Sequence, residues 1–318
     1  DTGATSGPAV AADVTVTFGA RKPVHVLADG AVRSGTVHLV DIGLDPWLAE
    51  PALSVLEAAD VGRAWRVPGP DDDKYSQGVT GVAAGSAIYP GAAVLSTGAA
   101  VLATSGMVRY AGWAADEVRA RWPEVVATGS VEDAGRVQAW LVGPGLGTGQ
   151  AGRDVLAEVL ADGVPTCVDA DGITLLAGRP DALRRRTAPT VLTPHDREFA
   201  RVAGAVGPDR IGAARRAAAD LGAVVLLKGN RTVVAGPDGT AYVNPTGTAW
   251  LATAGSGDVL SGLGGALLAG GVEPAAAVAA AAYLHGVAGR LAAGDAPTSS
   301  GAVLAALPAA LRAVLRPG

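Results

Sequence analysis

The sequence predicts an α/β fold with a doubly wound, mostly parallel sheet and helices on both of its faces. One observation predicts the parallel sheet, and a second bears on the division of the chain into domains. From Gly78 onward, short apolar runs alternate with alanine-rich windows of helical length, and this alternation of strands and helices is typical of a parallel sheet. The chain has 318 residues, about twice the roughly 150 of an average domain, so one large domain with a smaller piece fits as well as two equal domains.

A small N-terminal piece precedes the alternating pattern. Residues 14–18 and 35–41 are short β-branched runs between turn residues, which predicts two strands without a core of their own. Residues 67–74 combine proline, glycine and a run of charges, which indicates a linker or an exposed loop. We therefore expect three parts: an N-terminal fragment over residues 1–50, a linker over 51–77, and the main domain over 78–318.

The main domain is expected to begin with pairs of strands and helices. Apolar runs at 82–84, 140–142 and 191–192 are each followed by a helical window, at 90–104, 150–161 and 195–203 respectively. Because parallel strands present their carboxyl ends at one edge of a sheet, we expect ligands to bind in the loops that follow these strands.

The remainder of the main domain departs from this alternation. Residues 224–228, 232–235 and 240–243 are separated by short turns, which predicts antiparallel strands. The alanine-rich run 275–293 contains His285 and Arg290, so we expect a buried helix rather than a membrane span.

Composition and charge exclude several classes of function. Lys and Arg number 25 and Asp and Glu 30, giving a net charge of −5, so nucleic acid and membranes are not expected partners. The single cysteine, Cys167, stands in an apolar run and is expected to be buried, in a protein of a reducing, cytoplasmic compartment. The four histidines show no zinc-binding spacing, so no protein metal site is expected. The chain begins at Asp1 without a basic and apolar leader, and we interpret it as a protein without a secretory signal whose N-terminus is cut from something longer.

The strongest local motif is Gly255, Ser256, Gly257 and Asp258, which directly precedes a helical window. Small residues at the start of a helix leave backbone N–H groups uncovered where the helix dipole favours negative charge. The motif therefore predicts an anion hole with an acid beside it. In a purely structural account, Asp258 would only be the usual acidic residue of a first helical turn.

A second motif lies in a turn after an apolar strand. Lys228, Gly229, Asn230, Arg231 and Thr232 display an ammonium group, amides and a hydroxyl together. Such a set suits the phosphates and ribose of a nucleotide, although an ordinary polar hairpin explains it equally well when the motif is taken alone. The spacing GxxxxGK[ST] does not occur in the chain, so a nucleotide would be held by other means than a P-loop.

Two further corners lie at the expected ligand edge. His195 follows a strand and a proline, where it would either bind a ligand or begin a helix that Glu198 caps. Small residues at 84–86 and 89–93 join another strand to a helix. They permit tight packing of the helix on the sheet, and equally the approach of a flat ring to the backbone.

The glycines after the strand at 140–142 support a rival hypothesis. Gly147, Gly149 and Gly152 match the pattern GxGxxG, and Asp169 and Asp171 follow about twenty residues later, as in a dinucleotide-binding oxidoreductase. Against it, the glycines begin directly on the strand, at Gly143, so the fingerprint is displaced into the helix. A redox domain also gives no reason for the second glycine-rich motif or for the lysine turn.

Taken in order, the motifs resemble the ADP/ATP-dependent NAD(P)H-hydrate dehydratase family, whose fold is ribokinase-like. The stretches that match are 84–86 with 90–92, 142–147, 168–171, 192–195, 227–229 with Thr232, and 255–260. The resemblance extends from about residue 78 to the C-terminus. The sequence departs from the family at 246–258, where the family often has TGNPGMATGGTGD, and at 196–198, where it often has PGE.

The first residues of the chain resemble the last part of a companion family, the NAD(P)H-hydrate epimerases. The matching stretches are 2–7, 12–19 with Lys22, and 41–44. That family's catalytic aspartate and its potassium-site serine would lie upstream of Asp1. The resemblance therefore implies a C-terminal remnant of an epimerase domain, and no epimerase activity is expected of the chain.

The dehydratase resemblance implies a repair reaction. A phosphoryl group from ADP, or from ATP, is transferred to the hydroxyl of the S-form of NADH or NADPH hydrate, and phosphate then leaves to restore NAD(P)H. Catalysis would belong to Asp258 as general base and to Gly255, Ser256 and Gly257 as an anion hole that acts with Mg²⁺. The hydrate would be bound by Ala92, Gly145, His195 and Asp258, and the nucleotide by Lys228, Gly229, Asn230, Arg231, Thr232 and Gly257. A homo-oligomer is the expected assembly.

Three alternatives stay open at this point. A vitamin or sugar kinase of the same fold would stop at the phosphorylated product. A dinucleotide-binding oxidoreductase would reduce NAD⁺ without any nucleoside diphosphate, and a non-catalytic module would only bind a nucleotide.

Overall fold

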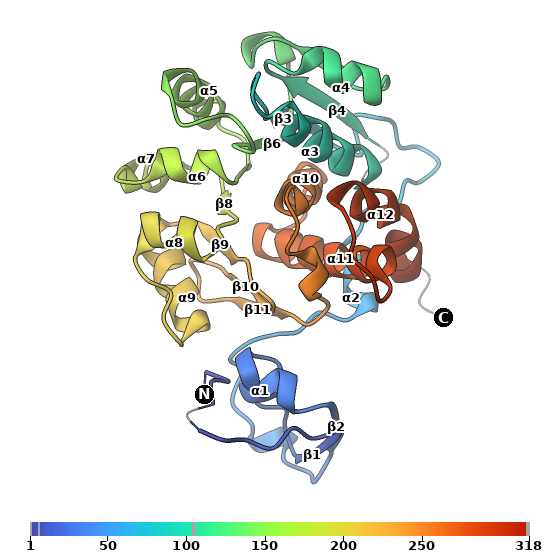
Figure 1. Ribbon diagram of the computed structural model, residues 1–318, viewed down its shortest axis with the longest axis vertical. Coiled ribbons are helices and arrows are strands. Elements are labelled where there is room, and N and C mark those ends of the chain that lie inside the picture. The colour runs from blue at the N-terminus through green and yellow to red at the C-terminus, as the bar shows by residue number, and fades with distance from the viewer. Residues whose placement is uncertain (1, 6, 104–105, 316–318) are drawn as a thin grey trace.

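A nine-stranded sheet forms the centre of the computed structural model, which describes residues 2–5, 7–103 and 106–315 (Figure 1). Its strands lie in the order β11-β10-β9-β8-β7-β6-β3-β4-β5. They are β3 (Val79–Ala83), β4 (Met107–Ala111), β5 (Val126–Thr128), β6 (Ala139–Val142), β7 (Thr166–Val168), β8 (Thr190–Leu192), β9 (Val224–Leu227), β10 (Thr232–Ala235) and β11 (Ala241–Asn244). Strands β3 to β9 are parallel, whereas β10 and β11 extend the sheet in antiparallel orientation. The predicted parallel sheet with an antiparallel segment is confirmed.

Helices cover both faces of the sheet. One layer consists of α2 (Ala58–Ala64), α3 (Pro90–Ala103), α4 (Ala115–Arg121), α10 (Ser256–Ala269), α11 (Pro274–Ala293) and α12 (Ser300–Leu315). The other consists of α5 (Gln150–Ala161), α6 (Asp171–Leu176), α7 (Pro180–Arg184), α8 (Asp196–Ala203) and α9 (Arg210–Leu221). Leu141 of β6 packs in the first layer, whereas Trp140 and Val142 pack in the second, because side chains alternate between the faces of a strand.

The order of the strands reverses beside β3. From β3 the chain continues outward through β4 and β5, and it then returns to place β6 on the other side of β3. Loops that leave the carboxyl ends of strands on either side of such a reversal diverge and open a crevice. The predicted ligand edge is therefore present in the fold.

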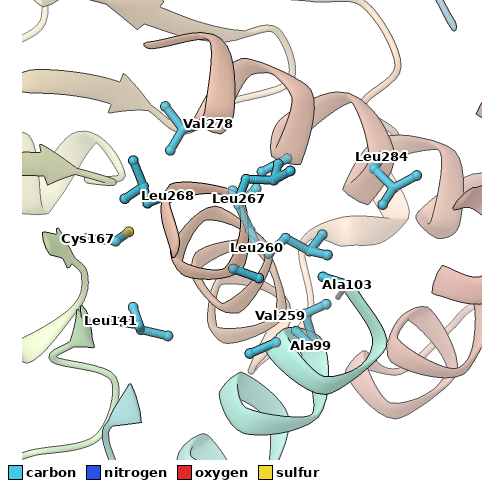
Figure 2. Packing of buried hydrophobic residues seen from close by; sticks show 14 of the residues in the cluster. Ala99, Ala103, Leu141, Cys167, Val259, Leu260, Leu267, Leu268, Val278 and Leu284 are labelled. Carbon is cyan, nitrogen blue, oxygen red and sulfur yellow. The ribbon is translucent and has the colours of Figure 1, made fainter. Parts of the chain in front are cut away.

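Helix α10 lies close against α3 and the sheet (Figure 2). The close approach depends on Gly262, because a Cβ there would lie 2.4 Å from the carbonyl oxygen of Ser96. Figure 2 shows Val259 and Leu260 of α10 near Ala99 and Ala103 of α3, residues of one buried cluster. The start of α10 is thus fixed relative to the ends of the strands.

Helix α11 is the one described helix that is long and apolar enough to cross a membrane, but 67% of its most apolar window is buried inside the fold. It packs against α10 and α12. Residues 275–293 therefore form the buried helix that the sequence predicts.

The N-terminal fragment holds two parallel strands, β1 (Val14–Phe18) and β2 (Thr36–Val40), and the helix α1 (Ala28–Arg33). Both predicted strands are present. Leu27 is buried and packs with the core beneath α9. Much of the fragment's apolar surface is exposed, as at Val14, Val16, Phe18, Leu39, Ile42 and Trp47. Short 3-10 helices occur at Pro23–His25 and Asp45–Trp47 in this part, and at Glu132–Ala134 and Ala249–Leu251 in the main domain.

Within the expected linker over residues 51–77, residues 54–65 pack against the main domain. Ser54 exchanges backbone hydrogen bonds with Ala241 and Val243, both 2.9 Å long, at the edge of β11. Helix α2 follows, and Val61 is fully buried in the core formed with α11 and α12. The Trp65 indole N–H donates to the carbonyl oxygen of Ala103 at 3.0 Å. The proline, glycine and acidic residues beyond it lie in a loop that is exposed at 67–71 and 73–76.

Candidate active site

A cavity of about 670 Å³ opens beyond the carboxyl ends of β7 and β9 and beside the first turn of α10. Eight of the predicted site residues line this cavity: His195, Lys228, Gly229, Asn230, Thr232, Ser256, Gly257 and Asp258. Three chain segments that are far apart in the sequence therefore meet in one place. Its wall is completed by the loop between β11 and α10, through Gly247, Thr248, Ala249, Leu251, Ala252 and Thr253.

The first turn of α10 begins at a glycine in the left-handed conformation. Gly255 caps the helix with φ of +82°, a conformation that other residues adopt at a cost. A Cβ on Gly255 would also lie 2.6 Å from the Leu95 side chain. Of the three predicted anion-hole residues, Ser256 already uses its backbone N–H, which donates to the carbonyl oxygen of Thr253 at 3.3 Å.

Asp258 lies in this first turn and faces the cavity. Burial raises the pKa of its carboxyl group to about 7, and the nearby charge of Asp169 acts in the same direction, whereas Lys228 opposes them. A carboxylate whose pKa lies near neutral pH is suited to accept a proton in catalysis.

The ammonium group of Lys228 is held by two carboxylates. Its Nζ donates to Oδ1 of Asp169 at 2.8 Å and lies 3.6 Å from Oε2 of Glu198. Burial by itself would lower the pKa of Lys228, but these two charges raise it above the ordinary value, so the group is positively charged at neutral pH. It is therefore less freely available to a nucleotide than its place in a turn suggests.

His195 has the structural role that its position allowed, and it also lines the cavity. Its Nδ1 accepts the backbone N–H groups of Arg197 and Glu198 at 3.1 and 3.2 Å. In return, the backbone N–H of His195 donates to Oε2 of Glu198 at 2.9 Å. The ring is half exposed, and its Nε2 lies 3.4 Å from Oε1 of Glu198.

The remaining predicted residues fall into two groups. Arg231 points away from this cavity, since its guanidinium donates to the carbonyl oxygen of Pro245 at 2.6 Å, and it lines a neighbouring cavity of about 960 Å³ that reaches α1. Ala92 and Gly145 lie against each other, because a Cβ on Gly145 would be 2.9 Å from that of Ala92. Neither lines the cavity of Asp258.

Three residues of the site were not among those predicted for it. Asp169 and Glu198 hold Lys228, and Nε2 of His285 lies 3.1 Å from Oγ of Ser256. Burial lowers the pKa of His285 to about 4, so its ring is neutral at physiological pH. The sequence marked Asp169 as a strand-end acid and Glu198 as a cap, but His285 carried no signal beyond its helix.

Asp171 explains the apparent dinucleotide fingerprint. Its Oδ2 accepts the backbone N–H of Gly147 at 2.8 Å, so the acid ties down the glycine-rich loop instead of facing a ribose. Among the described residues, no group of three or more His, Cys, Asp or Glu side chains is arranged to hold a metal ion.

The sequence profile of a family described as NAD(P)H-hydrate dehydratase matches residues 80–308. The chain belongs to this family. A relative from Neisseria meningitidis is named ADP-dependent (S)-NAD(P)H-hydrate dehydratase. It is 40% identical to this chain over 232 residues, which cover 69% of this chain and 78% of the relative.

Longer relatives are also similar. The bifunctional NAD(P)H-hydrate repair enzyme of Mycobacterium tuberculosis is 61% identical over 279 residues, covering 87% of this chain and 58% of that protein. The Mycobacterium leprae enzyme of the same name is 57% identical, covering 98% of this chain and 66% of its own length. The chain thus spans about three fifths to two thirds of these relatives.

Solved structures agree with the family assignment. The ADP/ATP-dependent NAD(P)H-hydrate dehydratase of Bacillus subtilis, co-crystallised with ATP and Mg²⁺, aligns with a TM-score of 0.75 at 28% identity, covering 82% of this chain and 99% of that one. A ribokinase-like superfamily protein of Enterococcus faecalis aligns with a TM-score of 0.75 at 25% identity, covering 84% of this chain and 98% of its own. The expected ribokinase-like fold is confirmed.

Proposed function

We propose that this chain is an ADP- or ATP-dependent dehydratase that restores NADH or NADPH from the S-form of its hydrate. The observation that carries the proposal is a partly buried carboxyl group, Asp258, at the N-terminus of α10, in one cavity with the ammonium group of Lys228. Family membership and the names of the relatives support the same reaction.

The chemistry proceeds in two stages. The hydroxyl oxygen of the hydrate attacks the terminal phosphorus of the nucleotide while Asp258 accepts the hydroxyl proton. General-base catalysis of this kind is typically worth roughly 10² to 10⁴ in rate. The ring carbon then loses phosphate, a far better leaving group than hydroxide, while a proton departs from the neighbouring carbon and the double bond returns. From ADP the products are NAD(P)H, AMP and phosphate.

The site offers two ways to offset the charge of the phosphoryl group. The N–H groups of Gly257 and Asp258 lie in the first turn of α10, where the helix dipole is positive, and Lys228 adds a full charge. Mg²⁺, where bound, would supply further charge neutralisation on the phosphates. Gly229, Asn230 and Thr232 would contact the nucleotide from the turn after β9.

The finer assignments belong to the same proposal. ADP is the proposed donor, since a relative is named for it, and the cytoplasm is the proposed compartment of a homo-oligomeric enzyme. Ala92 and Gly145 would contact the part of the hydrate that extends out of the cavity. Residues 1–50 would belong to the C-terminal part of an epimerase domain.

Turnover of purified S-hydrate with ADP, with ATP and without nucleotide tests the proposal. We expect the near-ultraviolet absorbance of the dihydronicotinamide to return together with one phosphate per hydrate, only when nucleotide is present. Accumulation of a stable phosphoester would instead identify a kinase. Reduction of NAD⁺ without nucleotide would identify an oxidoreductase, and binding without turnover a non-catalytic module.

A further inference from the structure

We propose that Asp169 is a positioning residue for phosphoryl transfer: its carboxylate holds the ammonium group of Lys228 against the first turn of α10 and prevents it from pairing with Asp258. The proposal rests on the function proposed above. Asp169 directly follows the last residue of β7, and it lines the same cavity as Lys228 and Asp258.

The first support is the fixed position of the Asp169 carboxylate. The side chain is only 2% exposed, so it cannot rotate into water. Its backbone N–H donates to the carbonyl oxygen of Val142 at 3.0 Å, and its carbonyl oxygen accepts the N–H of Gly172 at 3.0 Å. A rigid anion of this kind fixes the cation that binds to it.

The second support is backbone strain in the next residue. Ala170 has φ of +50° and ψ of −117°, and it is one of two described non-glycine residues with positive φ. A non-glycine residue in such a conformation costs on the order of 1–3 kcal/mol and is often found where a site requires one orientation. Ala170 lines the cavity directly.

The third support is the place where the ion pair lies. A Cβ added to Gly257 would be 3.4 Å from Nζ of Lys228 and 3.7 Å from Oδ2 of Asp169. Both charges therefore lie beside Gly257, one residue before Asp258. Without Asp169, the ammonium group would be left with Glu198 and with Asp258 itself as partners.

The charges around Asp258 show why the position of Lys228 affects the pKa of this residue. It is surrounded by Asp169 after β7, Asp171 on α6, Glu198 on α8 and Lys228 after β9, and the neutral His285 of α11 and the half-exposed His195 line the same cavity. Of the four charged groups, the three carboxylates raise the pKa of Asp258 and the ammonium group alone lowers it. A lysine free to approach Asp258 would make it a weaker base.

The pH dependence of turnover in Asp169→Asn and Lys228→Met tests the proposal. In Asp169→Asn, the acidic limb of kcat/KM should move to lower pH by about one unit, and the plateau should fall roughly ten-fold because the base is weaker. In Lys228→Met, the limb should move to higher pH, because the one opposing charge is lost. Asp171→Asn serves as the matched control, since it removes a neighbouring carboxylate that does not touch Lys228, and its shift should be smaller than that of Asp169→Asn.

A readout independent of turnover separates this proposal from the proposed function. The pKa of Asp258 can be followed by ¹³C NMR of the aspartate carboxyl groups, with the signal identified by its loss in Asp258→Asn. The positioning role is supported, even if the hydrate is not the substrate, when Asp169→Asn lowers the pKa of Asp258 more in the otherwise native chain than in the Lys228→Met background, because the direct effect of the lost Asp169 charge is present in both. An equal fall in the two backgrounds contradicts it. An unmoved pKa in both variants overturns it, and if Asp169→Asn does not fold, an unmoved pKa in Lys228→Met alone does so.

Discussion

The carboxyl group of Asp258 is buried in a place where its charged form is unfavourable, so that its pKa is raised to about 7. A folded-state pKa above the unfolded value means that the residue favours the fold at low pH and opposes it as the pH rises from about 4 to 7. The group proposed as the base is therefore also a source of instability at the pH where it works.

Replacing Asp258 with Asn should remove this instability and the activity together. We expect hydrate turnover to fall roughly 10²- to 10⁴-fold, while the free energy of unfolding at pH 8 rises by about 1–3 kcal/mol. Urea unfolding at pH 8 and pH 5 measures the second effect, and the gain should shrink at pH 5. A variant that turns over hydrate at the wild-type rate would exclude Asp258 as the base.

His285 should contribute the opposite dependence of stability on pH. Its pKa is lowered to about 4 by burial, so its stabilising contribution is present above pH 6.5 and is lost as the pH falls through 4. His285→Asn should therefore lose less stability than the wild type between pH 6.5 and 4, by up to about 3 kcal/mol. Equal slopes in unfolding experiments across this range would contradict a neutral, buried His285.

Sequence could predict Asp258 and the lysine turn because each motif is contiguous along the chain. The partners of these motifs are not. Lys228 meets Asp169 across 59 residues, and Ser256 meets His285 across 29, so both contacts depend on how the strands and helices pack. The ion pairs of the site therefore depend on the fold, whereas the two motifs can be recognised along the chain.

The start of helix α10 places two separate demands on Gly255: a positive φ and a lack of space for a side chain. Gly271, just beyond the other end of the same helix, has φ of +81°, and a Cβ added there would have no neighbour within 4 Å. The pair therefore separates conformational strain from crowding.

Gly255→Ala should be more destabilising than Gly271→Ala. We expect about 1 kcal/mol from strain alone at Gly271, and a further 1–3 kcal/mol from overpacking against Leu95 at Gly255. Thermal unfolding measures both, and hydrate turnover should fall only in Gly255→Ala because only that variant displaces the anion hole. Equal losses of stability would show that Leu95 gives way without cost.

Elements were predictable where a pattern repeats and less so where an element is short. Strand and helix alternation correctly indicated the buried strands, because apolar runs such as β6 must be covered on both faces. Helix α2 has seven residues, too few for a periodic pattern to stand out. Its place in the core is set by α11 and α12, which follow it by more than two hundred residues in the chain.

On the scale of the whole molecule, the N-terminal fragment is the part with the least covered apolar surface. Phe18 is 57% exposed and Trp47 is 83% exposed, and Phe18 stands opposite the exposed Val40 in the pair of strands β1 and β2. Contiguous apolar surface of this kind promotes association between molecules. The sequence predicted the two strands, but it could not show which of their faces lack a partner.

Phe18→Ser should reduce concentration-dependent association, which sedimentation velocity measures. Trp113→Ser is the matched control, because Trp113 is 77% exposed on the main domain, outside the N-terminal fragment. We expect the first variant to shift the distribution toward monomer and the second to leave it in place, with hydrate turnover retained in both. If both variants behave alike, the fragment is not the source of association.

Cys167 is fully buried beneath α10 (Figure 2), and burial raises the pKa of its thiol. Maleimides and hydrogen peroxide act on accessible thiolates, so the native chain should remain unmodified by either. A cysteine introduced at the rim of the cavity would then carry a fluorophore alone, and nucleotide-induced movement could be followed without first removing any native thiol.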